Sequence, residues 1–266
     1  MLFREKYELE LNPGRERKRT METMQTFTQT VRIEQSDCDF RNQMMPAALL
    51  RKAQQIAIDH CNAVGLDDAV YHRTNTAFLM VKAAVELYRA IDNGEVLQVT
   101  TIPAQPQRAV FHRFTAFVDE SGSMAAACDS RWVLVDVSSR RILRHPPEEM
   151  QYPFYRTPEQ TLDFSLPRIP TVEGTPILAG YSLCDTNHHI NNTRYADLAC
   201  DAIDTACMEE NQVRRMVLSY HNEVPFGQSF LLSAAKGEDG YWYLQGKSQG
   251  GVCVETGVWL ERLSDI

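Results

Sequence analysis

The sequence of 266 residues predicts an α+β protein made of two tandem units, each an antiparallel sheet wrapped around a long central helix. The order strand, helix, then about four strands occurs twice along the chain. Apolar residues at spacings of three and four indicate the helices, and alternating apolar and polar residues indicate the strands. The pattern S-x-C-D at Ser36–Asp39 and at Ser182–Asp185 marks the same place in each unit. Together these observations indicate an internal duplication.

The first unit is predicted to span residues 23–150. A strand is expected from Thr26 to Gln35, and a helix from Pro46, which suits a first helical turn, to Val64 before Gly65. Four strands follow, with Asn93-Gly94 and Ser121-Gly122 as turns: Phe78–Arg89, Glu95–Ala104, Val110–Asp119 and Met124–Val137. Residues 1–22 are highly charged and are predicted to form a poorly ordered arm.

Residues 151–176 have no sustained periodicity and are interpreted as a linker to the second unit, residues 177–266. A short strand (Ile177–Cys184) is expected to lead into a helix from Asn192 to Met208, whose apolar stripe includes Tyr195. Four more strands are predicted in the rest of the chain: Arg214–Val224, Ser229–Lys236, Tyr241–Ser248 and Val252–Arg262.

A polar turn precedes the second helix. If this segment is extended, Asp185, Asn187 and His189 project from one face, because side chains two positions apart share a face. Asn191 and Asn192 follow as residues that can cap the first helical turn. In the register of the S-x-C-D pattern, the first unit has other residues at the positions of Asn187 and His189, namely Arg41 and Gln43. Only the second unit therefore carries the polar trio.

The composition excludes several classes of protein. A hydrophobic share of 44% with 23% charged residues is that of a globular protein, and no apolar run approaches the roughly 18 residues of a membrane span. A formal net charge of −8 disfavours nucleic-acid binding. Seven cysteines without CxxC spacing indicate reduced thiols and a cytoplasmic location: Cys38, Cys61, Cys128, Cys184, Cys200, Cys207 and Cys253.

The stretch from Asp185 to Tyr195 resembles the D-x-N-x-H-x-N-N-x-x-Y signature of acyl-acyl-carrier-protein thioesterases, which are double hot-dog enzymes. Leu218–Glu223 is similar to the family's strand that ends in a functional glutamate. Two further stretches, Arg131–Asp136 and Arg140–Pro146, are similar to the motif at the end of its first unit. The resemblance covers the chain from about Thr26 onward.

The resemblance implies hydrolysis of the thioester of fatty acyl-acyl carrier protein, with release of free fatty acid and termination of fatty acid synthesis. It implies the catalytic residues Asp185, Asn187, His189 and Glu223, and no cofactor. The first unit is expected to shape the acyl-chain pocket, through the helix at Pro46–Val64 and the strand at Phe78–Tyr88. The acidic carrier protein is expected to dock on arginines, for which the chain offers Arg108, Arg113, Arg140, Arg141, Arg144, Arg214 and Arg215.

Thioester hydrolysis needs an activated water and a stabilised oxyanion. Either Glu223 or Asp185 can serve as the base, His189 can bind the water or the substrate carbonyl, and Asn187 can donate to the oxyanion. The N-terminus of the second helix can add backbone donors. Plant members commonly have a cysteine directly after the glutamate, where this chain has Val224, so a mechanism based on water is expected rather than one based on a cysteine nucleophile.

Each of these residues alone has a simpler interpretation. Asp185 and Asn187 are common turn residues, Asn191 and Asn192 are common helix caps, and His189 could be a half-buried histidine with ordinary partners. Cys184, His188 and His189 lack a second ligand pair at metal-site spacing, so no metal is expected. Only the combination at the family's spacing points to catalysis.

Three alternative functions remain at this level: a hot-dog acyl-CoA thioesterase, a non-catalytic acyl-binding protein and a hot-dog dehydratase. The first class usually has one hot-dog per chain, and the intact quartet speaks against the second. The first unit has no additional His–Asp arrangement that would support a dehydratase. The sequence leaves open whether the protein is a monomer or a homodimer.

Overall fold

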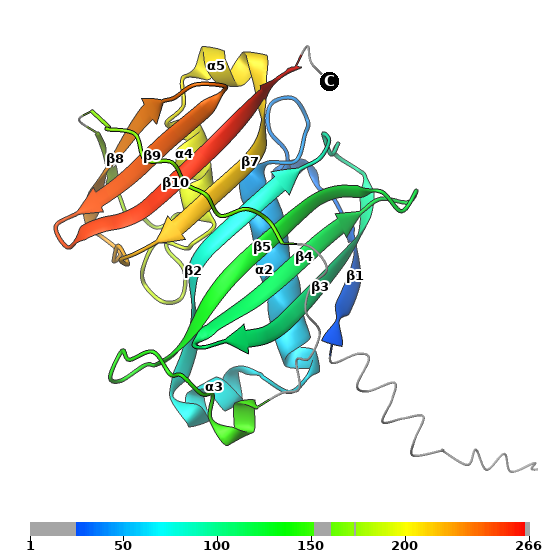
Figure 1. The fold of residues 1–266 in the computed structure, drawn as a ribbon, viewed down its shortest axis with the longest axis vertical. Helices are drawn as coiled ribbons and strands as arrows, with labels where there is room; N and C mark the ends of the chain where they lie inside the picture. Colours follow the sequence, from blue (N-terminus) through cyan, green and yellow to red (C-terminus); the bar gives the residue numbers. More distant parts are fainter. Residues whose placement is uncertain (1–24, 152–160, 173, 264–266) are drawn as a thin grey trace, which may run out of the picture.

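A twisted antiparallel sheet runs through the whole molecule (Figure 1). The computed structural model describes residues 25–151, 161–172 and 174–263, so the predicted arm at residues 1–22 lies outside the described residues. The sheet in this part of the chain has ten strands: β1 (Phe27–Arg32), β2 (Thr76–Leu87), β3 (Val96–Gln107), β4 (Val110–Val118), β5 (Met124–Asp136), β6 (Thr175–Leu178), β7 (Asn211–Tyr220), β8 (Ser229–Lys236), β9 (Tyr241–Ser248) and β10 (Gly251–Arg262).

The strand order shows the duplication. It runs β1-β3-β4-β5-β2-β7-β10-β9-β8-β6, so that each half repeats the other outward from a central pair. In this pair β2 and β7 are antiparallel, and Ala84 lies opposite Val217. Both residues are buried, at 0% and 1% exposure. The two predicted hot-dog units therefore share one continuous sheet.

In Figure 1 a long helix, α2 (Pro46–Ala63), lies behind the first half of this sheet, and a short helix, α4 (Arg194–Asp201), lies behind the second half. Another short helix, α5 (Thr205–Glu210), lies at the upper end of the second half. The apolar stripe of α2 and that of α4 belong to one hydrophobic core, which extends through both units. A short helix that the sequence did not predict, α3 (Asp68–Thr74), begins at Asp67, whose carboxylate caps the Val70 N–H. The helix predicted from Pro46 to Val64 is confirmed within one residue.

The predicted second helix, Asn192–Met208, is wrong in its length. α4 ends at Asp201, and Asp204 adopts an extended conformation (φ −52°, ψ 130°) before α5 begins. The Asp204 carboxylate accepts a hydrogen bond from the Cys207 N–H, so this residue starts a new helix instead of continuing the old one. The predicted strand Ile177–Cys184 is also too long, because pairing with β8 stops at Leu178.

The described part of the linker packs on the outer face of the sheet, opposite α2 and α4. Leu162, Phe164 and Leu166 contact an apolar patch that includes Ala84 and Val217. The linker is fixed at both ends by polar contacts: the Leu162 N–H donates to the buried Asp129, and Arg168 forms an ion pair with Glu255 (Nε–Oε1 2.6 Å). It therefore crosses the junction of β2 and β7 and ties the two units together.

Within the described residues, no helix combines the length and the apolar character needed to cross a membrane. All seven cysteines lie in the described part of the chain and are free thiols. Burial raises the pKa of several of these thiols. The pKa of Cys200 is raised to about 12. Thiols held in the protonated form by burial are weak nucleophiles.

Replacement Glu255→Gln is expected to reduce the acid sensitivity of the protein. Hydrogen bonds from Arg168, and also from Tyr243 and His221, lower the pKa of Glu255 from 4.5 to about 2. Because the folded-state pKa lies below the unfolded-state value, this stabilisation is complete above about pH 4.5 and is lost as the pH falls toward about 2. Urea unfolding at about pH 5 and about pH 3 measures the loss, which should be larger for the unmodified protein than for the variant. An equal loss of unfolding free energy in both proteins would contradict the attribution of this acid sensitivity to Glu255.

Candidate active site

The polar turn is a tight hairpin, not the extended segment that was expected. Cys184 and Ile190 form an antiparallel bridge, and the Asp185 N–H donates to the His189 carbonyl at 3.1 Å. The chain reverses through His188, which has a left-handed conformation with φ 60°. Asp185 stabilises this reversal, since its Oδ1 accepts the Asn187 N–H at 2.8 Å. Asp185 and His189 consequently lie on opposite arms of one hairpin, joined by a backbone hydrogen bond.

Asn191 connects this hairpin to α4. Its side-chain N–H group donates to Asp185 Oδ2 at 3.0 Å, while its Oδ1 accepts from the N–H and the hydroxyl of Thr193. The N-cap of α4 is Thr193, which makes no side-chain cap hydrogen bond, so the prediction that Asn191 and Asn192 cap the helix is wrong. Asn191 instead accepts from the N–H of this N-cap residue, and the Asn192 carbonyl accepts from the Tyr220 hydroxyl at 3.0 Å. Because Asn191 occupies a backbone donor at the start of α4, fewer helix N–H groups remain for an oxyanion than the sequence suggested.

His189 and Glu223 come together through the backbone. The segment after β7 lies antiparallel to the hairpin: Ile190 N–H donates to the Val224 carbonyl at 3.0 Å, and His189 forms a bridge with Pro225. This pairing brings His189 Nε2 to 3.8 Å from Glu223 Oε1. The histidine side chain is 18% exposed and the glutamate side chain 47% exposed, so solvent reaches this pair.

The hydrogen bond at the other ring nitrogen orients His189. Nδ1 lies 3.2 Å from the Ile190 carbonyl oxygen, which can only accept. The proton of the neutral ring therefore sits on Nδ1, and Nε2 keeps its lone pair toward Glu223. A distance of 3.8 Å is too long for a direct hydrogen bond, but it lets one water bind to both groups at about 2.8 Å.

A cavity of about 320 Å³ lies between the hairpin and α2 of the first unit. Asp185, Asn191 and Thr193 contribute to one side of it. The opposite side comes from one face of α2, with Arg51, Gln54, Gln55 and Ile58. The Gln54 side-chain oxygen is buried and has no hydrogen-bond partner among the described residues. Sequence reasoning missed Gln54, because only the tertiary structure shows that this position of α2 faces the second unit.

The four predicted residues are therefore not all in one place. Asp185 lines the cavity, and His189 and Glu223 form a pair on the same loop system. Asn187 lies at the exposed tip of the hairpin. No group of three or more histidine, cysteine or acidic side chains arranged to hold a metal ion occurs in the part of the chain that the structure describes.

The first unit contains the same hairpin without the same side chains. Its backbone repeats every contact: Cys38 bridges Met44, the Asp39 N–H donates to the Gln43 carbonyl at 2.8 Å, and Asn42 has φ 65°. The Met44 N–H donates to Ile91 as the Ile190 N–H does to Val224. This register makes Ala90 the counterpart of Glu223. The first unit thus has Arg41, Gln43 and Ala90 at the positions of Asn187, His189 and Glu223.

Comparison with known proteins identifies the family. A model of the acyl-ACP thioesterase N-terminal domain matches residues 24–152, and a model of the acyl-ACP thioesterase C-terminal domain matches residues 176–249. The chain belongs to the acyl-ACP thioesterase family. It is accordingly a thioester hydrolase that acts on fatty acyl-acyl carrier protein. No curated protein matches the sequence.

Solved structures support the fold of this acyl-ACP thioesterase. An acyl-ACP thioesterase from Bacteroides thetaiotaomicron VPI-5482 is 21% identical, with a TM-score of 0.79 over 90% of this chain and 99% of that chain. The 12:0-ACP thioesterase from Umbellularia californica is 14% identical, with a TM-score of 0.73 over 89% of this chain and 97% of that chain. The predicted double hot-dog fold is confirmed by these likenesses.

Replacement His189→Ala is expected to lower turnover by about two to four orders of magnitude, the range for loss of an acid–base group. Steady-state hydrolysis of an acyl-acyl-carrier-protein substrate measures the effect. His188→Asn is the matched control, because asparagine tolerates the left-handed backbone at this exposed neighbouring position. Near-normal turnover of folded His189→Ala would remove this histidine from the mechanism.

Proposed function

We propose that His189 and Glu223 activate the water that hydrolyses the acyl-carrier thioester. The observation that carries this proposal is the approach of His189 Nε2, with its lone pair available, to Glu223 Oε1 at 3.8 Å. A water bound to both groups can lose its proton to Nε2 as it attacks the thioester carbonyl. The carboxylate of Glu223 then stabilises the imidazolium that forms.

The reaction is completed by transfer of the same proton. The tetrahedral intermediate collapses with cleavage of the carbon–sulfur bond, and the thiolate of the carrier's prosthetic arm leaves. His189 returns the proton to this thiolate, so that one water yields one carboxylic acid and one free thiol. No covalent acyl-enzyme is needed. The absence of a cysteine after Glu223 fits this course, since Val224 is 1% exposed and belongs to the hydrophobic core.

Asp185 is better suited to positioning than to proton transfer. Both of its carboxylate oxygens accept hydrogen bonds from the protein, one from the Asn187 N–H and one from the Asn191 side chain. Glu223 accepts no hydrogen bond from the residues that the structure describes, so its oxygens are available to water. In this proposal Asp185 holds the hairpin that carries His189, and the exposed amide of Asn187 donates to the developing oxyanion.

The cavity between the hairpin and α2 supports the entry of substrate beside Asp185. Its position agrees with the expectation that the helix of the first unit contributes to the substrate pocket. Among the arginines considered for carrier docking, Arg140, Arg141 and Arg144 are exposed after β5, as is Arg108 after β3. Arg214 and Arg215 are instead engaged in ion pairs with acidic side chains. We therefore favour the exposed group for contact with an acidic carrier.

The proposal also includes the bounds of the two units, the cellular location and the oligomeric state. The units are assigned to residues 23–150 and 177–266, with residues 151–176 as linker, and the location is assigned to the cytoplasm, which suits seven free cysteines. A homodimer is the alternative to a monomer, and light scattering after size-exclusion chromatography measures the difference.

Purified protein is expected to release free thiol from acyl-acyl-carrier-protein thioesters faster than from the matching acyl-CoA thioesters. A panel of chain lengths, with Glu223→Gln as the control, tests the proposal and gives the chain-length preference. Loss of about two orders of magnitude in the variant supports the assigned role of Glu223. Equal or faster release from CoA thioesters would favour a CoA thioesterase, and no release from either substrate would favour an acyl-binding protein.

Replacement Gln54→Leu is expected to raise the free energy of unfolding and to lower kcat/KM. A buried oxygen without a partner costs about 1–3 kcal/mol, so its removal should raise the free energy of unfolding by up to this amount. If substrate or water uses this oxygen in the cavity, the same change lowers kcat/KM by up to about tenfold. Urea unfolding and steady-state kinetics measure the two effects. A variant with unchanged kcat/KM would show that Gln54 does not contact the substrate or its water.

A further inference from the structure

The first unit has a cavity of its own, of about 410 Å³, which is the counterpart of the cavity at Asp185. Residues that line one cavity correspond, through the internal duplication, to residues that line the other, with the same difference in residue number throughout. The hairpin sides correspond as Asp39 to Asp185, Met45 to Asn191 and Ala47 to Thr193, and the helix sides as Asp197 to Arg51, Cys200 to Gln54 and Asp201 to Gln55. The duplication thus produced two cavities at equivalent places, one beside Asp185 and one beside Asp39.

The cavity beside Asp39 in the first unit cannot carry out the proposed hydrolysis. Gln43 and Ala90 line it at the positions of His189 and Glu223, so it has neither the imidazole nor the carboxylate. Arg41 is also committed elsewhere. Its Nη1 donates to the carbonyls of Met208 (2.6 Å) and Asn211 (2.8 Å) at the end of α5, and its Nη2 pairs with Asp39. What remains is a space suited to binding.

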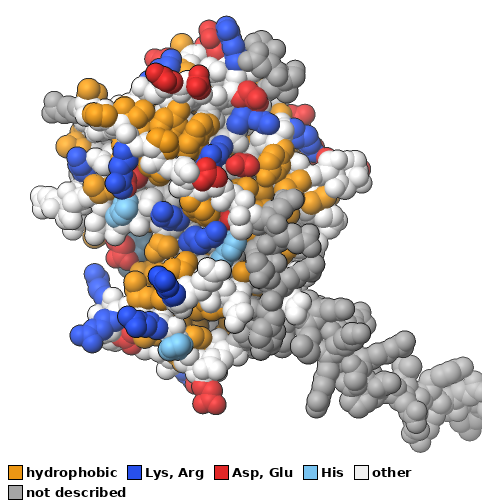
Figure 2. Space-filling view, viewed as in Figure 1, with side chains coloured by type: hydrophobic (Ala, Val, Ile, Leu, Met, Phe, Trp, Pro, Cys, Tyr) orange, Lys and Arg blue, Asp and Glu red, His pale blue; other side chains and the backbone are white. Residues whose placement is uncertain are grey.

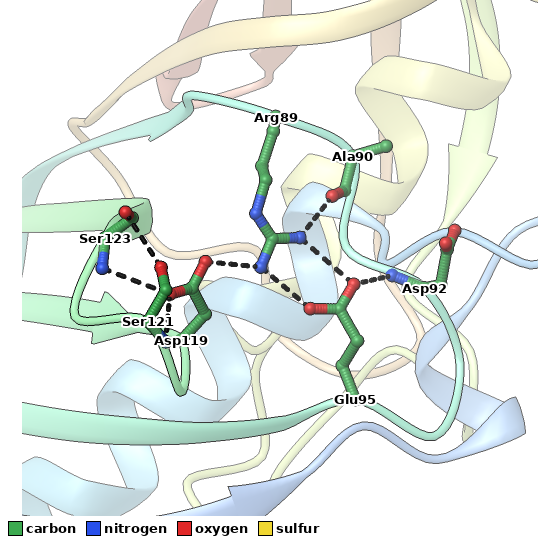
Figure 3. Close-up of polar contacts among 7 residues, drawn as sticks. All are labelled: Arg89, Ala90, Asp92, Glu95, Asp119, Ser121 and Ser123. Atoms are coloured by element: carbon green, nitrogen blue, oxygen red, sulfur yellow. Dashed lines mark hydrogen bonds and ion pairs between the residues drawn. The ribbon is translucent and has the colours of Figure 1, made fainter.

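The walls of this cavity are mostly apolar and well supported. Apolar residues from both units line it: Met44, Leu87, Ile91, Ile203, Met208 and Val213. Arg89 fixes the loop that supplies Ala90 and Ile91, because it donates to the Ala90 carbonyl, to Glu95 and to Asp119 (Figure 3). The Met44 N–H holds the same loop through the Ile91 carbonyl at 2.8 Å. A wall fixed at this many points does not collapse easily into the space.

Two buried hydrogen-bond donors accompany these walls. Gln212 is 6% exposed and lines the cavity, and its side-chain Nε2 has no partner among the described residues. Arg41 Nε is in the same condition. Buried donors without acceptors are costly, so a ligand with an acceptor oxygen would be favoured here.

The charges nearby select the kind of acceptor. Asp197 and Asp201 line the cavity. Arg41, the cation of the lining, already pairs with Asp39, which also lines the cavity. A carboxylate would therefore meet like charge, whereas an uncharged oxygen would not.

We propose that this cavity is a second, non-catalytic site that binds a straight-chain lipid with an uncharged oxygen at its head, such as a fatty alcohol. The alkyl chain lies against the apolar walls, and the head oxygen accepts hydrogen bonds from Gln212 Nε2 and Arg41 Nε. The site is separate from His189 and Glu223 and does not depend on the function proposed for them.

Calorimetric titration of the full-length protein with 1-decanol tests this site. Removal of one donor in Gln212→Leu should weaken binding by about two- to tenfold. Cys200→Phe, which places a large side chain in the cavity, should abolish binding here. Its matched control is Gln54→Phe, the equivalent change in the cavity at Asp185, which should leave this binding intact.

Several outcomes would overturn the proposal. These are no saturable binding of 1-decanol, equal affinity in Gln212→Leu and unmodified protein, and loss of binding in Gln54→Phe but not in Cys200→Phe. Decanoate binding as tightly as 1-decanol would overturn the preference for an uncharged head. Circular dichroism verifies folding, and Gln212→Leu decides the matter if Cys200→Phe does not fold. Because the readout is binding without turnover, failure here leaves the proposed hydrolysis untouched.

Discussion

The antiparallel pairing of β2 with β7 joins two sheets into one, and most of the structure depends on this junction. Ala84 and Val217 face each other at its centre and are almost completely buried. On one side the junction is covered by the common core of α2 and α4, and on the other by the linker residues Leu162 and Phe164. Because both faces are covered, the two units are held at a fixed position relative to each other.

This fixed position allows each unit to complete a cavity of the other. α2 supplies Arg51 and Gln54 to the cavity beside Asp185, and α4 supplies Asp197 and Cys200 to the cavity beside Asp39. Figure 2 shows charged side chains of both signs scattered over the viewed face between apolar areas, with basic side chains gathered toward the end where Figure 1 draws α3. Each of the two cavities is therefore built by both halves of the chain.

The sequence predicted the fold more completely than the site. The alternation of strands such as Ser229–Lys236 and Tyr241–Ser248 gave their limits correctly, because each has one buried face and ends at a turn. The helix at Asn192–Met208 was predicted as one element because its apolar stripe continues past Asp204. The competing capping hydrogen bond from Cys207 is local and was not visible in that periodicity.

At the site, the spacing of the residues did not predict their geometry. The alternation of Asp185, Asn187 and His189 suggested an extended segment, whereas hydrogen bonds across the hairpin separate Asn187 at the tip from His189 in the arm. The pairing of His189 with Glu223 depends on contacts between segments over thirty residues apart, and the contribution of Gln54 depends on packing between units. Neither can be read from local patterns.

The hairpin of the first unit keeps the full backbone hydrogen-bonding frame of the hairpin at residues 185–189, although its side chains differ. The frame therefore does not need the reactive groups in order to form, and the reactive groups can change without loss of the frame. Substitutions can therefore add or remove the reactive side chains in either unit while its hairpin stays folded. Asparagine, histidine and glutamate at Arg41, Gln43 and Ala90 would restore the quartet around Asp39. The cost would fall on α5, whose final carbonyls would lose the guanidinium that now binds them.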